Sequence, residues 1–202
     1  MKKDSYVRVH AVLFSLVLNL LVTHVMAEEF HYAHIYKTTQ SCEESKESIL
    51  AELRKLGAYV EYIGMGLSSG KIIQPRPTRM DSSYISNQYY DVPSNRMDTL
   101  FVPLAGDARH LWSNIMRSPK YLPTLSARVM AACKGIGLVA YDHWWEDSVY
   151  YGYFPDETVR LFKEVQSSRS RPNPNMKEIQ TVEGVRRTIN WGYRYNPYGL
   201  LP

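Results

Sequence analysis

The sequence lacks most of the residue patterns by which an enzyme is usually identified. It contains two cysteines among 202 residues and no C-x-x-C spacing, which would indicate a redox or zinc site. It contains no G-x-S-x-G motif around a nucleophilic serine. A glycine-rich segment resembles a phosphate-binding loop but fails the pattern, because Met65 replaces the first glycine and Ile72 follows Lys71 where Ser or Thr is required. These absences disfavour serine hydrolases of that type, P-loop proteins and thioredoxin-like oxidoreductases.

Apolar runs long enough to cross a membrane are also lacking. The longest run, residues 11–22, has 12 residues, whereas a spanning helix needs about 20. It follows three basic residues and precedes Val-Met-Ala at 25–27, which suits a signal-peptidase site. We therefore expect residues 1–27 to be a cleaved signal peptide, with an uncleaved anchor as the alternative. The mature protein is expected to be exported, periplasmic or secreted, of bacterial type, and without a transmembrane span.

The two cysteines, Cys42 and Cys133, both lie in the part that would be exported. In an oxidising compartment such a pair is usually bridged, so we predict a Cys42–Cys133 disulfide. The alternative is a reactive thiol at Cys42, because a place in the first turn of a helix favours the thiolate. The missing C-x-x-C spacing favours the structural bridge.

Helical and strand patterns in the central part of the chain predict the fold class. We expect three helices, at 42–56, 107–117 and 123–133, and two central strands, at 137–145 and 148–154. Ser41 and Glu44 have the spacing of a capping box at the start of the first helix. A hairpin that follows a helical run, without regular βαβ alternation, favours an α+β fold with helices packed on a mainly antiparallel sheet.

Composition divides the exported part into a domain and a tail. Residues 28–165 are expected to form one α+β domain, in which 75–93 is a long surface loop. Further short strands are expected at 30–37, 58–63 and 99–104, and a third short apolar run at 158–162 follows the second central strand. Residues 166–202 carry six basic and two acidic side chains and are expected to be a linker followed by a basic, aromatic tail.

The end of this tail is patterned as a strand. Its apolar face would consist of Ile189, Trp191, Tyr193 and Tyr195. Soluble monomers rarely leave such a stripe in water, so it should join this protein's own sheet or extend a partner's sheet by β-augmentation. We favour the partner, because a polar linker gives reach and the excess of basic residues suits an acidic surface.

Catalytic candidates are confined to the segment that joins the two central strands. They are Asp142, His143, Glu146 and Asp147, which could supply a general base or the paired carboxylates of a glycosidase. However, Asp142 and His143 are neighbours on a strand and would face opposite sides, and polar residues at a turn are ordinarily solvated. A secreted hydrolase acting on sugar or cell-wall polymers is therefore the alternative function.

Metal ligands are sparse. His31 and His34 are the closest pair of histidines, and on a strand they would point to opposite faces. Two imidazoles alone do not complete a coordination shell. We expect no metal site and no cofactor.

Aromatic residues crowd the second central strand and the tail, which favours a binding function. Amphipathic rings are frequent at interfaces and stack on sugars or side chains, although one face of each strand should be core. We expect binding of another protein or an envelope component, and not of nucleic acid, which an exported protein rarely meets. The candidate binding residues are Trp144, Trp145, Tyr151, Tyr153, Arg186, Arg187, Trp191, Tyr193, Arg194 and Tyr195.

Overall fold

The structure is a computed structural model of the chain. It describes residues 31–58, 78–93, 95–105, 108–143, 147–166 and 174–196. Several sequence predictions lie outside the described residues: the signal peptide at 1–27, nearly all of the strand at 58–63, and the side chains of Trp144, Trp145 and Glu146.

A six-stranded mixed sheet forms the centre of the fold, in the order β1-β6-β5-β4-β3-β2. The strands are β1 (Tyr32–His34), β2 (Arg79–Asp81), β3 (Asp98–Leu104), β4 (Ile136–His143), β5 (Asp147–Tyr153) and β6 (Thr158–Leu161). Every neighbouring pair is antiparallel except β3 and β4. A parallel pair needs a crossover connection, and helix α5 (Tyr121–Ala132) lies in that connection. The predicted α+β class and the mainly antiparallel sheet are confirmed.

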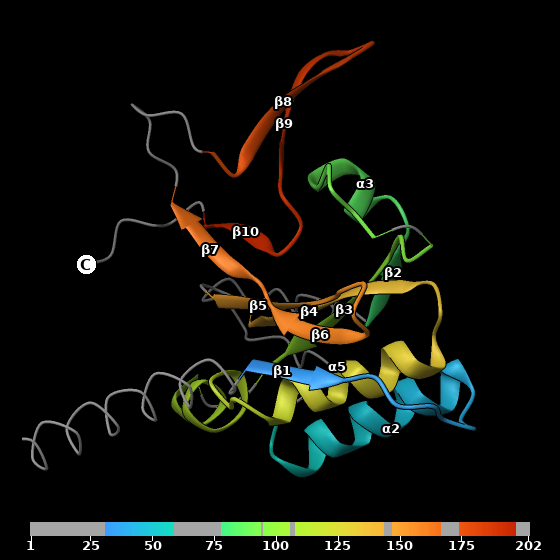
Figure 1. The fold of residues 1–202 in the computed structure, drawn as a ribbon. Helices are drawn as coiled ribbons and strands as arrows, with labels where there is room; N and C mark the ends of the chain where they lie inside the picture. Colours follow the sequence, from blue (N-terminus) through green and yellow to red (C-terminus); the bar gives the residue numbers. More distant parts are fainter. Residues whose placement is uncertain are drawn as a thin grey trace, which may run out of the picture. The chain divides into compact units, whose positions relative to one another are not determined.

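Helices α2 (Cys42–Lys55) and α5 cover one face of the sheet (Figure 1). The predicted capping box begins α2: the Glu44 amide donates to Ser41 Oγ at 3.3 Å, and the Ser41 amide donates to Glu44 Oε2 at 2.7 Å. Ile49 and Leu53, one turn apart on α2, are fully buried. The expected helix at 107–117 is present as α4 (Ala108–His110) followed by a π-helical segment, η2 (Leu111–Met116).

Strand β4 is buried on both of its faces. Val139 and Tyr141 belong to the hydrophobic cluster beneath α5, whereas Leu138 belongs to a second cluster on the opposite face. Successive residues of a strand point to opposite sides, so the predicted alternation of this strand is confirmed. Neither face is left to solvent along most of β4, and the opposite face therefore needs a second covering layer.

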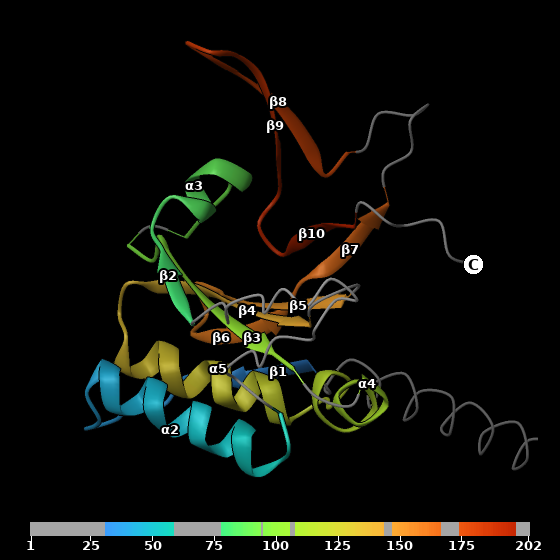
Figure 2. The ribbon, with the colours of Figure 1, turned by 180° about the vertical axis from the view of Figure 1, so that it is seen from behind.

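That second layer comes from the end of the expected domain and from segments that were expected to be a loop and a tail (Figure 2). It contains α3 (Tyr84–Gln88), β7 (Lys163–Gln166), β8 (Met176–Thr181), β9 (Gly184–Ile189) and β10 (Tyr193–Asn196). The expectation of a surface loop at 75–93 is wrong, because this segment includes β2 and α3, and Ile85 and Tyr89 are buried. Helix α3 has five residues, which is too short for a helical period to be read from the sequence.

The tail is also not one continuous strand. Strand β9 pairs antiparallel with β8, the chain turns at Gly192 with a φ of 91°, and β10 then pairs parallel with β7. Trp191, at the turn, is 9% exposed and packs in the second cluster. The structure thus differs from our preference for a partner's sheet: residues 193–196 pair with a strand of their own chain.

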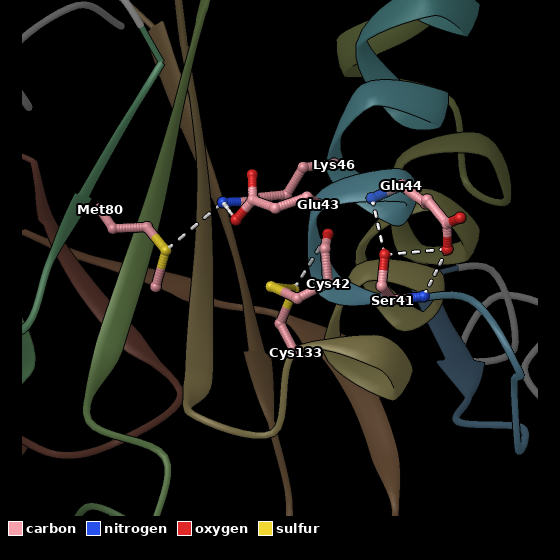
Figure 3. Close-up of polar contacts among 7 residues, drawn as sticks. All are labelled: Ser41, Cys42, Glu43, Glu44, Lys46, Met80 and Cys133. Atoms are coloured by element: carbon pink, nitrogen blue, oxygen red, sulfur yellow. Dashed lines mark hydrogen bonds and ion pairs between the residues drawn. A yellow bond between two sulfur atoms is a disulfide. The ribbon is translucent and has the colours of Figure 1, made fainter.

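The predicted disulfide is present. Cys42, the first residue of α2, is bonded to Cys133, which directly follows α5, and their Cα atoms are 4.7 Å apart (Figure 3). The bridge fastens the two helices that cover the first face. It excludes the alternative of a reactive thiol, since the chain has no free cysteine.

The bond also bears on the compartment. A disulfide of this kind is typical of exported proteins. No helix among the described residues is both long and apolar enough to span a bilayer. Both observations are compatible with export.

Loss of the bridge should destabilise the protein. A disulfide restricts the unfolded chain, so Cys133→Ser should lower the free energy of unfolding by about 2 to 5 kcal/mol, and Cys42→Ser by a similar amount. Urea unfolding of both variants beside the parent protein, with and without reductant, measures this. Reductant should destabilise the parent alone. Alkylation of two thiols in the unreduced native protein, seen as added mass, would contradict the bridge.

The packing of Trp191 gives a second prediction, which separates a docked tail from a free arm. Trp191→Ala should lower the free energy of unfolding by about 3 to 5 kcal/mol, because it removes a buried ring. Val182→Ala, on the same tail but at a fully exposed position, is the matched control and should change stability by less than about 0.5 kcal/mol. Equal, negligible effects in urea unfolding would mean that the tail does not pack on the domain.

Candidate functional site

The face of the sheet opposite α2 and α5 carries a group of half-buried aromatic and polar side chains. The strand register places them together: Ala140 pairs with Phe101 of β3 and with Tyr150 of β5, and Asp142 pairs with Ser148. Residues 140 and 142 point to the same face of β4, so their partners do too. Helix α3 adds one further ring. We call this group the open-face cluster, and its members are Tyr84, Phe101, Asp142, Ser148 and Tyr150.

Short polar contacts hold the open-face cluster together. The Ser148 hydroxyl donates to Asp142 Oδ1 at 2.7 Å, and the Tyr84 hydroxyl donates to that of Tyr150 at 3.1 Å. The Tyr84 ring meets Phe101 edge-to-face, with ring centres 5.0 Å apart. Burial chiefly raises the pKa of Tyr84, and the nearby Tyr150 and Asp142 raise it further. Tyr84 is therefore a neutral hydrogen-bond donor at ordinary pH.

Two arginines flank the cluster. Arg194 of β10 is 8% exposed, forms an ion pair with Glu164, and places its guanidinium 5.7 Å from the centre of the Tyr150 ring. Arg79 of β2 lies 4.5 Å from the centre of the Phe101 ring. Ring faces attract cations through their quadrupole, so both contacts stabilise the edges of the cluster.

The groups present limit the chemistry that the cluster can perform. Asp142 accepts a hydrogen bond from the Ser148 hydroxyl, whereas a serine nucleophile requires a base that a third group orients. Hydroxyl donors, one carboxylate and several rings are the groups that fix the position of a bound partner. Within the described ranges, no three His, Cys, Asp or Glu side chains converge as metal ligands do.

The predicted catalytic segment is only partly described. His143 and Asp147 end β4 and begin β5, and their backbones pair with each other. Their side chains, and all of Glu146, lie outside the described residues. Of the four candidates, Asp142 alone has a described side chain, and its partner is Ser148.

The predicted aromatic binding residues separate into core and half-buried positions. Tyr151 is fully buried on the α5 side, so its ring is not on the surface. Tyr153 is half-buried, and Arg96 lies 4.0 Å from the centre of its ring. The Trp191 indole donates to the Tyr153 carbonyl at 2.8 Å and packs edge-to-face on Phe162. The expectation that one face of each strand is core holds for β5.

The remaining tail residues lie in the second layer. Tyr193 is half-buried against the second hydrophobic cluster, and the backbone of Tyr195 pairs with Val165. Arg186 donates to the Asn87 side chain at 2.8 Å and so fastens β9 to α3. Arg187 is exposed and lies 3.3 Å from Glu178 of β8. The structure thus brings Arg194 to the open-face cluster, whereas Arg186 and Arg187 belong to the β8–β9 hairpin.

Tyr84, Phe101, Ser148 and Tyr150 were not among the predicted site residues. The available signal was the concentration of tyrosine at positions 84, 89 and 90 in a segment that otherwise resembles a loop. Large aromatic side chains are usually buried to a considerable extent, so three of them are unusual in a fully solvated loop. That excess alone indicated that the segment packs on another part of the chain.

Comparison with known proteins gives no further indication of the site's role. No protein-family model matches the chain, and neither the curated proteins nor the solved structures contain a significant match to it.

Proposed function

We propose that this chain is an exported, non-enzymatic protein that binds another protein or an envelope component through the open-face cluster and the second layer of its domain. The observation that carries the proposal is the open-face cluster. It combines half-buried rings, hydroxyls and one carboxylate, and among its described side chains no third group orients Asp142 as a base for Ser148. Surfaces of this composition supply the anchoring residues of interfaces.

The β8–β9 hairpin supports the same proposal. An isolated two-stranded hairpin is marginally stable in water, and here Arg186 anchors one side of it to α3. Val182 at the turn is fully exposed and Val185 is 58% exposed. A folded element that presents apolar side chains beside the exposed cations Lys177 and Arg187 offers both contact area and charge to a partner.

Export is supported by the covalent bridge and by the amino-terminal pattern. The Cys42–Cys133 disulfide favours an oxidising compartment. Residues 1–27 have the charge and apolar length of a signal peptide. The proposal therefore places the partner in the periplasm or outside the cell.

Site-specific photo-crosslinking in the exporting cell tests the proposed interface. A photoreactive phenylalanine in place of Val182 or Tyr150 should give a discrete adduct that mass spectrometry identifies as the same partner. The control position is Leu56, which is 42% exposed at the end of α2 on the other side of the sheet, and it should give none. Adducts at all three positions, or at none, would argue against a specific interface in the second layer.

The hydrolase alternative has one observation in its favour. The strand register sets His143 opposite Asp147, and residues directly opposite in an antiparallel pair are close neighbours on one face. A histidine beside a carboxylate is the usual arrangement of a general base and the group that orients it. Glu146 directly precedes Asp147 in the sequence.

Substitution separates the alternative from the proposal. We expect His143→Ala and Glu146→Gln to leave partner crosslinking and the urea midpoint unchanged. Assays on cell-wall fragments and oligosaccharides should detect no turnover in the parent protein. A turnover that the parent shows and that either variant reduces by about 100-fold or more, as expected for loss of a general acid or base, would favour the hydrolase.

A further inference from the structure

The pairing of charged side chains points to the chemistry of the partner. Arg194 pairs with Glu164, and Arg160 pairs with Asp156. Asp142 is different: within the described part of the chain, its carboxylate receives a hydrogen bond from Ser148 and forms no ion pair. A half-buried carboxylate is costly to desolvate unless an opposite charge or several donors compensate it.

We propose that Asp142, with Ser148, Tyr84 and Tyr150, binds the ammonium group of a lysine side chain that a partner protein presents. This rests on the proposed function and specifies its contact. The ammonium group has three donors and no acceptor. The Asp142 carboxylate has one oxygen that is not engaged by Ser148, and the Ser148 and Tyr150 hydroxyl oxygens provide further acceptors on the same face.

The surrounding rings favour a cation as the bound group. Two rings of the cluster already attract guanidinium groups, Phe101 that of Arg79 and Tyr150 that of Arg194. Glu164 neutralises Arg194, so the charge of that arginine does not simply repel a second cation. Desolvated cations beside aromatic faces gain more than exposed ones, and the half-buried position of Asp142 provides such surroundings.

A metal ion fits these groups less well than an ammonium group. Calcium takes six to eight oxygen ligands, usually with several carboxylates, whereas the cluster has one carboxylate and three hydroxyls. A sugar could use the same hydroxyls and rings, but it would leave the carboxylate without a counter-charge. A lysine side chain would neutralise the carboxylate, donate hydrogen bonds to the oxygen acceptors and place a cation beside the rings.

The test uses the oxidised full chain and a defined probe. Nα-acetyl-lysine methylamide is titrated into ¹⁵N-labelled protein, and amide chemical shifts are followed. We expect saturable shifts at Tyr84, Asp142, Ser148 and Tyr150, with a dissociation constant in the millimolar range. The matched probe is Nα,Nε-diacetyl-lysine methylamide, which keeps the aliphatic stem and removes the charge, and it should bind at least about tenfold more weakly.

Matched variants assign the binding to the carboxylate. Asp142→Asn keeps the shape of the side chain and should weaken binding of the lysine probe by about tenfold or more. Glu183→Gln, at the exposed hairpin turn, should leave its affinity unchanged. Tyr150→Phe removes one hydroxyl and should weaken binding by a few-fold, which provides a second test should the Asp142 variant fail to fold.

Several results would overturn the inference: no saturable shift, equal binding of the two probes, an undiminished affinity in the Asp142 or Tyr150 variant, or saturable binding of a methyl glucoside in place of the lysine probe.

The crosslinking experiment separates failure of the lysine contact from failure of the proposed function. A partner adduct without lysine binding would overturn the lysine contact alone. Lysine binding without any adduct would count against the proposed function and leave the chemistry of the cluster supported.

Discussion

The burial of β4 on both faces is the constraint on which the rest of the structure depends. Residues 138–141 are fully buried, and β4 pairs with β3 on one side and β5 on the other. A strand of this kind needs a covering layer on each face. The first layer is a conventional pair of amphipathic helices that a disulfide fastens together. The second layer is assembled from short segments that come from two distant parts of the chain.

The composition of the second layer explains how it stabilises the fold. Its packing is aromatic and arginine-rich: Trp191 and Phe162 meet edge-to-face, and Arg194 lies over Tyr150. Rings contribute large buried areas while their polar ends stay satisfied at a wet surface. The Phe162 ring also lies close to the backbone of Gly152. A Cβ atom at Gly152 would be 2.1 Å from that ring, so only glycine allows this packing. The open-face cluster is the part of this packing that remains half-buried.

The chemistry of the cluster follows from its position at the end of the β4–β5 hairpin. There Asp142 is half-buried, and its carboxylate replaces the apolar residues that come earlier on the same strand face. Ser148, on the paired strand, donates to Asp142 and so offsets part of the cost of desolvating its carboxylate. Placed deeper, beside Leu138, the same carboxylate would require a full counter-charge. The edge of the core therefore admits a charged group whose natural complement is a cation from outside.

The sequence by itself determined the elements whose signals are local. Near neighbours in the sequence determine the capping box of α2, the helical spacing of Ile49 and Leu53, and the alternation along β4 and β5. The disulfide could be predicted because Cys42 and Cys133 are the only two cysteines in the sequence. Only the tertiary structure decided what the second layer is. Helix α3 is too short to show a period, and β10 pairs with β7 across 26 intervening residues. The cluster joins Tyr84 of α3 to residues of β4 and β5 that lie more than 50 positions further along the chain. Such pairings depend on which apolar faces of the central sheet still need a covering layer. The identity of those faces is a property of the whole fold and not of any one segment.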